Sequence, residues 1–218
     1  MHNGITRLDP AWAALLIVDM QNAFIKPEGS VSRRLNTDPC RKIVPAIVRL
    51  RAFCKQLQIP VIFTKQEHHP QDAETIKKLH KLASAAKVGT HLYNRMNLKQ
   101  PALYGSWDSE FIDELKPLPD EYIVVKNKFS AFYCTILETL LRSLNRTVLL
   151  VTGVNTNTCV ESTVRDAYQR DIDVIVLADC VAAPSEVYDL HLASLKNVER
   201  YFGWVMSSEE LINALKAV

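Results

Sequence analysis

The chain has 218 residues, 48% of them hydrophobic, and a formal net charge of +2 at pH 7. This size and composition allow a substantial core and predict one domain over residues 1–218. Acidic and basic residues are interspersed, which argues against binding to nucleic acid or to an anionic membrane. Residues 1–10 lack an apolar signal core, and no segment has the roughly 20 apolar residues of a membrane span, so we expect a cytoplasmic protein.

The cysteines are odd in number and scattered, and no two form a Cys-x-x-Cys pair. This pattern argues against a disulfide framework and against a zinc knuckle. We therefore expect free thiols at all of them. The five positions are Cys40, Cys54, Cys134, Cys159 and Cys180.

Short apolar, β-branched runs alternate with longer amphipathic segments along the chain. Strands buried on both faces are continuous Val/Ile/Leu runs, and repeated strand–helix units form parallel sheets covered by helices. We predict a three-layer, doubly wound α/β fold with a six-stranded parallel sheet and Rossmann-like topology. The predicted strands are 14–19, 61–64, 122–126, 148–151, 174–178 and 204–207, and the predicted helices are 39–58, 135–145, 159–169, 186–201 and 209–218.

Residues 66–107 interrupt this alternation. The segment is polar, and we expect a mixture of short helix and loop. An excursion of this length in a compact domain is often a lid or an oligomer contact.

Three ionisable residues lie at or beyond the carboxyl ends of predicted strands. Asp19 ends the first strand, Lys126 ends the third, and Cys159 follows the turn after the fourth. In open parallel sheets the ligand site lies beyond the carboxyl ends of the strands. We therefore expect a carboxylate, an ammonium group and a thiol to converge.

These three groups suit a nucleophilic cysteine. A thiol with a pKa of about 8.5 is only about 3% ionised at neutral pH, so a nucleophilic cysteine needs a base and a cation. We expect Cys159 in the first turn of a helix, whose dipole favours a thiolate. Asp19 would accept the thiol proton and return it to a leaving nitrogen, while Lys126 stabilises the thiolate. The backbone amides of Asn155 and Cys159 are the candidates for binding an oxyanion.

Similar residues elsewhere have a structural interpretation. A cysteine on a helix is usually a small buried apolar residue, and we keep that interpretation for the four other cysteines. Asp179 also ends a predicted strand, but the residues after it offer no charged partner, so we expect a structural role. Lys128 lies past its strand and is expected to be solvated.

Three segments of the chain resemble the isochorismatase-like cysteine hydrolases, and the resemblance covers nearly the whole sequence. It implies a catalytic triad of Asp19, Lys126 and Cys159, and no cofactor. The family motif Lys-x-Arg-Tyr-Ser-Ala-Phe selects Lys126 over Lys128 as the catalytic lysine. The family also has a cis peptide bond, which would fall at Val154–Asn155. The three segments are residues 16–24 (LIVDMQNAF), 126–132 (KNKFSAF) and 152–166 (TGVNTNTCVESTVRD).

Within the family, residues 104–108, 111–115 and 201–205 resemble the branch of ureidoacrylate, carbamoyl-amide and biuret hydrolases. The resemblance implies hydrolysis of a C–N bond in a small amide or carbamoyl substrate by a homo-oligomer, either a dimer or a tetramer. Isochorismatases proper lack the cysteine, so Cys159 favours an amide. The residues that we expect to contact substrate are Phe24, Gln66, Glu74, Trp107 and Phe129.

Two alternatives remain open at this point. Nicotinamidases of the same superfamily bind a metal through an Asp-x-His segment, which corresponds to residues 64–70 (TKQEHHP). Gln66 replaces the acidic ligand there, and glutamine is a poor ligand for zinc or iron, so we expect no metal. The other alternative is a catalytically silent binding or assembly module, against which the intact triad argues.

Overall fold

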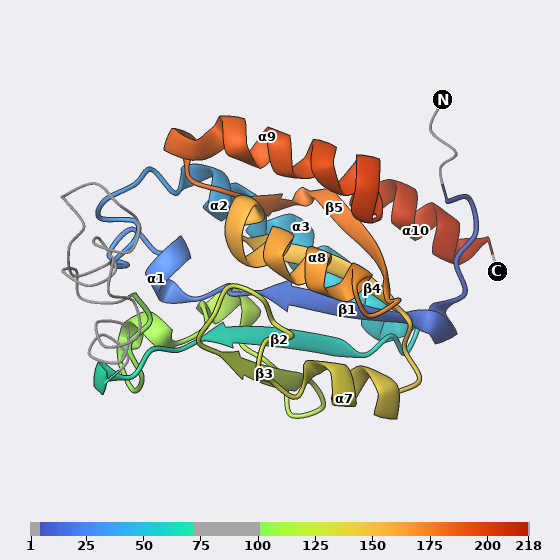
Figure 1. Ribbon diagram of the computed structural model, residues 1–218, viewed down its shortest axis with the longest axis horizontal. Coiled ribbons are helices and arrows are strands. Elements are labelled where there is room, and N and C mark those ends of the chain that lie inside the picture. The colour runs from blue at the N-terminus through green and yellow to red at the C-terminus, as the bar shows by residue number, and fades with distance from the viewer. Residues whose placement is uncertain (1–4, 72–100, 218) are drawn as a thin grey trace.

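A single six-stranded parallel sheet forms the centre of the fold (Figure 1). The computed structural model describes residues 5–71 and 101–217, so Glu74 lies outside the described residues. The strand order is β3-β2-β1-β4-β5-β6, and every neighbouring pair is parallel, which confirms the predicted fold class. The strands are β1 (Ala13–Val18), β2 (Val61–Gln66), β3 (Tyr122–Lys126), β4 (Val148–Val154), β5 (Asp173–Ala182) and β6 (Trp204–Met206).

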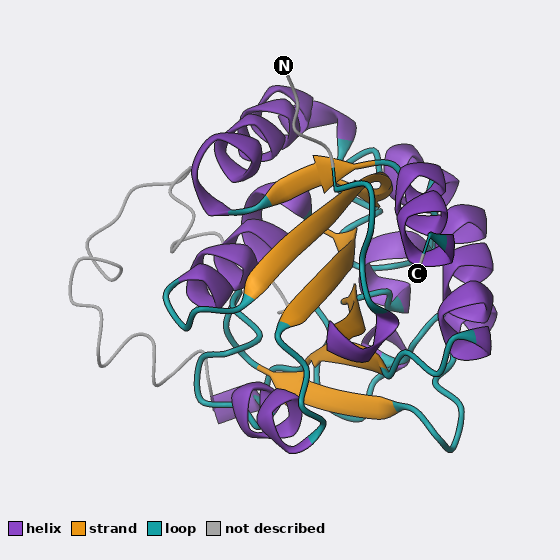
Figure 2. Cartoon of the chain, turned by 90° about the vertical axis from the view of Figure 1, so that its right-hand side faces the viewer, coloured by secondary structure: helices purple, strands orange, loops and turns teal. Residues whose placement is uncertain are grey.

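Helices cover both faces of the sheet, as Figure 2 shows. Residues of α2, α3 and α10 pack into one apolar core, and residues of α7 and α8 pack into the other. Within residues 5–71 and 101–217, none of the helices has the length and apolar character needed to cross a membrane. The helices are α1 (Asn22–Ile25), α2 (Asp38–Lys42), α3 (Val44–Gln56), α7 (Leu137–Ser143), α8 (Glu161–Tyr168), α9 (Tyr188–Asn197) and α10 (Ser208–Lys216).

Short 3-10 and π-helical turns flank several helices. The predicted helix 39–58 is divided into α2 and α3 because Pro45, in the first turn of α3, has no N–H for the hydrogen bond that would continue α2. The predicted helix 186–201 consists of a 3-10 turn, α9 and a π-helical turn. The turns are η1 (Pro10–Trp12), η2 (Trp107–Ser109), η3 (Asp113–Leu115), η4 (Thr156–Val160), η5 (Ser185–Val187) and η6 (Val198–Phe202).

The central strands β1 and β4 are buried along their whole length. Leu15 and Ile17 face one core, whereas Leu16 and Val18 face the other, as the alternation of side chains along a strand requires. Burial on both faces explains why the sequence shows these strands as continuous apolar runs rather than alternating ones.

Strand β5 is longer than predicted, and the prediction that Asp179 ends it is wrong. A register shift between β4 and β5 allows β5 to continue to Ala182. The Asp179 carboxylate accepts hydrogen bonds from the backbone N–H (2.7 Å) and the hydroxyl (2.5 Å) of Ser208. Asp179 therefore anchors the first residue of α10, a structural role.

Gly153 allows β4 to approach β1 closely at the carboxyl end of the sheet. Its φ is +101°, and a Cβ built on it would lie 2.1 Å from the carbonyl oxygen of Val18. One residue earlier, the Thr152 hydroxyl donates a 3.1 Å hydrogen bond to the carbonyl oxygen of Leu16. The residue after Val18 is Asp19, so this approach brings the end of β4 beside that carboxylate.

We predict that Gly153→Ala destabilises the protein much more than Gly105→Ala. Both glycines have positive φ, which costs an alanine about 1 kcal/mol or somewhat more, but a Cβ at Gly105 meets nothing within 4 Å. Overpacking against Val18 adds about 1–3 kcal/mol at Gly153 alone. Urea denaturation measures both free energies of unfolding, and equal losses would contradict the proposed close approach.

Candidate active site

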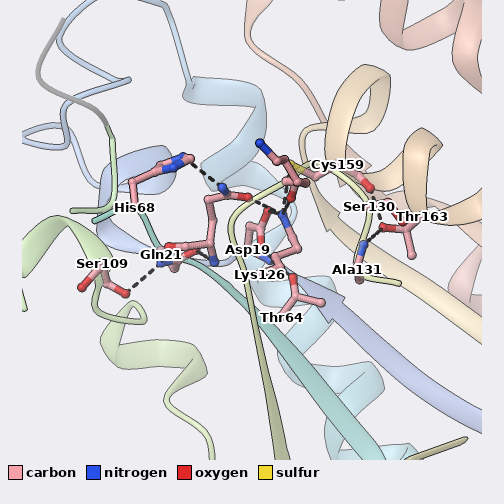
Figure 3. Close-up of polar contacts among 12 residues, drawn as sticks. Asp19, Gln21, Thr64, His68, Ser109, Lys126, Ser130, Ala131, Cys159 and Thr163 are labelled. Atoms are coloured by element: carbon pink, nitrogen blue, oxygen red, sulfur yellow. Dashed lines mark hydrogen bonds and ion pairs between the residues drawn. The ribbon is translucent and has the colours of Figure 1, made fainter. Parts of the chain in front are cut away.

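Asp19, Lys126 and Cys159 meet at the carboxyl edge of the sheet (Figure 3). The Lys126 Nζ lies 2.7 Å from Asp19 Oδ2 and 3.4 Å from Cys159 Sγ. The exposed fractions of the three residues are 1%, 2% and 7%, so the cluster is shielded from water. Because β2 separates β1 from β3, the Lys126 side chain reaches across the end of β2 to contact the other two.

The Lys126 ammonium group has four polar neighbours for its three hydrogens. Besides Asp19 and Cys159, it contacts Gln66 Oε1 at 2.5 Å and the carbonyl oxygen of Lys128 at 3.1 Å. Lys128 thus contributes its backbone, while the residue itself is exposed, as expected. These contacts keep a buried cation compensated on several sides.

Gln66, predicted to contact substrate, lies within this cluster. An ammonium group can only donate, so the side-chain oxygen of Gln66 faces Lys126 and its amide nitrogen faces His68 Nε2, 2.9 Å away. The imidazole of His68 therefore accepts at Nε2. The Gln66 side chain, which the family resemblance placed at the position of a metal ligand, is thus committed to Lys126 and His68.

Gln21 is a site-supporting residue that the sequence prediction missed. Its side-chain nitrogen donates to the carbonyl oxygens of Gln66 (2.9 Å) and Ser109 (2.8 Å), and its side-chain oxygen accepts from the Gln66 N–H (2.8 Å). Gln21 is fully buried. The polar pair Gln21 and Asn22, between the apolar residues Met20 and Ala23, was the available signal.

Thr64 on β2 holds the second oxygen of the Asp19 carboxylate. Its hydroxyl donates to Asp19 Oδ1 at 2.6 Å and accepts from the Asp19 backbone N–H at 3.1 Å. Asp19 itself has a φ of 51°, which turns the chain sharply after β1. Oδ1 is therefore bound by Thr64, and Oδ2 is directed to Lys126.

Cys159 lies in the π-helical turn η4 that precedes α8, so the prediction that it occupies the first turn of that helix needs correction. In η4 the backbone N–H groups of Thr158 and Val160 donate to the carbonyl oxygen of Asn155. The peptide bond Val154–Asn155 is cis, at the position that the family resemblance implied. The Cys159 carbonyl accepts a 2.7 Å hydrogen bond from Thr163, which ties the turn to α8.

Burial opposes the thiolate that the helix dipole and Lys126 were expected to favour at Cys159. Burial raises the pKa of Cys159 to about 12; the Lys126 cation lowers it, and the Asp19 carboxylate raises it. For Lys126, burial lowers the pKa, but Asp19 and Cys159 raise it, and the net pKa lies above the ordinary value. Lys126 therefore stays charged beside a neutral thiol.

The three predicted aromatic substrate contacts have different environments. Phe24 lies on α1 and is buried in one core, and Phe129 is half-buried against the other. Trp107, in η2, is 50% exposed, and its carbonyl oxygen accepts a hydrogen bond from the Asn22 side chain. Gln66, by contrast, contacts the triad directly through its bond with Lys126.

All five cysteines are free, but the prediction that Cys134 is buried is wrong. It lies in a turn before α7 with a φ of 54°, which places it outside the helix predicted to begin near it. Cys40, Cys54 and Cys180 are buried as predicted.

Within the described residues, no group of three or more His, Cys, Asp or Glu side chains is arranged to hold a metal ion.

Comparison with known proteins gives a consistent result. The sequence model of the isochorismatase domain family matches residues 13–210 of this chain. A ureidoacrylate amidohydrolase, RutB, from Methylobacterium radiotolerans is 36% identical over 215 residues, which cover 95% of this chain and 81% of the relative. A cysteine hydrolase structure from Pseudomonas syringae pv. phaseolicola has a TM-score of 0.81 at 25% identity and covers 100% of this chain and 99% of that one. N-carbamoylsarcosine amidase from Thermoplasma acidophilum has a TM-score of 0.68 at 26% identity, with coverage of 90% and 96%.

We predict opposite effects of Asp19→Asn and Lys126→Met on the alkylation of Cys159 by iodoacetamide. Removing the Asp19 carboxylate lowers the pKa of the thiol, so more thiolate is present at a given pH and alkylation accelerates. Removing the Lys126 cation raises that pKa and slows alkylation. Well below the pKa, one pKa unit changes the thiolate fraction about tenfold.

The measurement uses a Cys134→Ser background, because that exposed thiol would otherwise react. Peptide mass spectrometry gives the rate at Cys159, and circular dichroism verifies that each variant is folded. A change in the same direction for both variants would contradict the electrostatic account.

Proposed function

Because the chain belongs to the isochorismatase family, we propose that it is a cysteine hydrolase that cleaves a C–N bond in a small amide or carbamoyl compound. The observation that carries this proposal is the buried Lys126 ammonium group between the Asp19 carboxylate and the Cys159 thiol. Cysteine is the nucleophile of choice for such chemistry, and the neighbouring carboxylate is the proton acceptor that it needs.

In the proposed first half-reaction, Cys159 Sγ attacks the substrate carbonyl carbon and its proton passes to Asp19. A thiol with a pKa near 12 is not ionised beforehand, so proton transfer accompanies the attack. The C–N bond then breaks, Asp19 returns the proton to the leaving nitrogen, and a thioester remains on Cys159.

In the second half-reaction, water attacks the thioester and gives a proton to Asp19. The C–S bond breaks, the acid product leaves, and the proton returns to Cys159. Lys126 remains charged throughout and compensates the negative charge that moves between sulfur and carboxylate.

The backbone amides of Asn155 and Cys159 are the proposed donors to the oxyanion of each tetrahedral intermediate. Both belong to the segment that joins β4 to α8. Fixed backbone donors need no reorganisation during the reaction, and removal of one such donor typically costs about 10²–10³ in rate.

For the substrate, we propose a compound with a carbamoyl group on nitrogen. The names ureidoacrylate amidohydrolase and N-carbamoylsarcosine amidase both denote such substrates. Four other residues are still only predicted to contact the substrate: Phe24, Glu74, Trp107 and Phe129. We propose that Gln66 also supports the Lys126 cation, because its side-chain oxygen binds the ammonium group.

We also propose a cytoplasmic location and a homo-oligomeric state, a dimer or a tetramer. The free thiols support the first, since reducing compartments keep cysteines unpaired.

We predict that Cys159→Ala loses at least about 10³-fold in turnover while the fold is retained. Ammonia release is measured with ureidoacrylate, N-carbamoylsarcosine, biuret, nicotinamide and maleamate. Cys134→Ala is the matched control, because it removes an exposed cysteine outside the cluster and should keep full activity. An active Cys159→Ala variant would refute the mechanism.

We further predict that turnover survives dialysis against EDTA, because each proposed step uses only side chains, backbone amides and water. We would measure ammonia release before and after dialysis and determine the metal content of the same samples by elemental analysis. Loss of activity on dialysis and its return with zinc would favour a metal-assisted amidase instead.

A further inference from the structure

Helix α9 makes one polar contact with the turn that carries Cys159 and one with the start of the helix that follows it. His191 Nδ1 lies 2.8 Å from the hydroxyl oxygen of Thr156, the first residue of η4. The Ser194 hydroxyl donates a 2.5 Å hydrogen bond to Glu161, the first residue of α8. The helix therefore contacts the segment both just before and just after the nucleophile, and Figure 1 shows α9 and α8 on the same side of the molecule.

We propose that His191 is a positioning residue, which through Thr156 holds the proposed oxyanion amides of Asn155 and Cys159 in place; this inference rests on the proposed function. Thr156 directly follows Asn155, one of the two proposed donors. Its exposed fraction is 1%, and its carbonyl oxygen accepts a hydrogen bond from the Glu161 N–H. With the hydroxyl bound to His191 as well, Thr156 is fixed from two directions.

The packing of α9 makes this polar contact important for its position. Ser194 is the only fully buried residue of α9, whereas Leu190 and Leu192 are 47% and 39% exposed. Apolar packing is non-directional and permits small shifts, but a hydrogen bond fixes both distance and direction. The polar pairs therefore add fixed distances and directions to the apolar contact that Leu195 of α9 makes with the core that also contains residues of α7 and α8.

The His191 ring is itself held in place. It is half-buried and stacks on Tyr188, with ring centroids 5.6 Å apart and planes 21° from parallel. Burial lowers the pKa of His191, so the imidazole is neutral near pH 7 and pairs with the Thr156 hydroxyl as a neutral partner.

Two variants separate the hydrogen bond from the ring. His191→Phe keeps an aromatic ring against Tyr188 but loses the contact with Thr156, whereas His191→Asn keeps a polar atom near the position of Nδ1. We expect kcat to fall about tenfold in His191→Phe with little change in KM, the loss expected for one buried hydrogen bond that acts on the transition state. His191→Asn should recover most of that loss.

Thr156→Val provides the other half of a double-mutant cycle. If the contact acts as one unit, Thr156→Val lowers kcat by a similar factor, and the double variant is no slower than either single variant. Ser208→Ala is the control for a structural effect, since it removes a hydrogen bond at the start of α10. We expect it to lower the melting temperature without changing kcat.

A binding measurement tests the contact between His191 and Thr156 even if the protein hydrolyses none of the amides. Butyraldehyde adds to a cysteine thiol: the S–C bond forms, the thiol proton passes to Asp19, and the carbonyl oxygen becomes an oxyanion, which the amides of Asn155 and Cys159 would bind. We measure how well butyraldehyde protects Cys159 from iodoacetamide, in a Cys134→Ser background. The His191→Phe variant should need about tenfold more butyraldehyde for the same protection. Its alkylation rate without butyraldehyde should be unchanged, because alkylation forms no oxyanion.

The outcomes are distinguishable. If the wild type hydrolyses no substrate yet His191→Phe weakens aldehyde protection, the proposed function fails while the positioning role stands. Wild-type kcat and wild-type aldehyde protection in His191→Phe would overturn the positioning role. Slower alkylation without aldehyde would overturn it also, because His191 would then act on the thiol.

Discussion

The buried ion pair between Asp19 and Lys126 is the interaction on which the rest of the site depends. Taking each ion out of water costs several kcal/mol, and this cost is recovered only if close partners compensate both charges. Thr64 binds one carboxylate oxygen, Lys126 approaches the other, and Gln66 and the Lys128 carbonyl share the ammonium group. These partners lie on or next to β1, β2 and β3, so the pair holds together the carboxyl ends of three strands.

The same pair also acts on the Cys159 thiol. Its two charges shift the pKa of that thiol in opposite directions, and burial, the largest cause, raises it to about 12. In the proposed mechanism, the carboxylate that would remove the proton of the neutral thiol is already in place. The transfer would become favourable only when a carbonyl carbon arrives, which would limit side reactions of a thiolate.

A shell of neutral polar groups surrounds the charged ones. Gln21 and His68 orient Gln66, and His191 and Ser194 hold the ends of the turn that carries Cys159. Their bonds are directional, which suits the small tolerance of the proposed oxyanion site for displacement.

The amino-acid sequence alone was sufficient to predict the parallel sheet and the meeting of Asp19, Lys126 and Cys159, because continuous apolar runs mark buried strands and their carboxyl ends share one edge. The family motif distinguished Lys126 from Lys128. Only the tertiary structure decided the burial of Cys159, the orientation of Gln66, the exposure of Cys134, and the contacts of Gln21, Thr64 and His191. Burial and hydrogen-bond partners set these properties, and both come from segments distant along the chain, as with Thr156 and His191 on separate elements. A local pattern does not contain them.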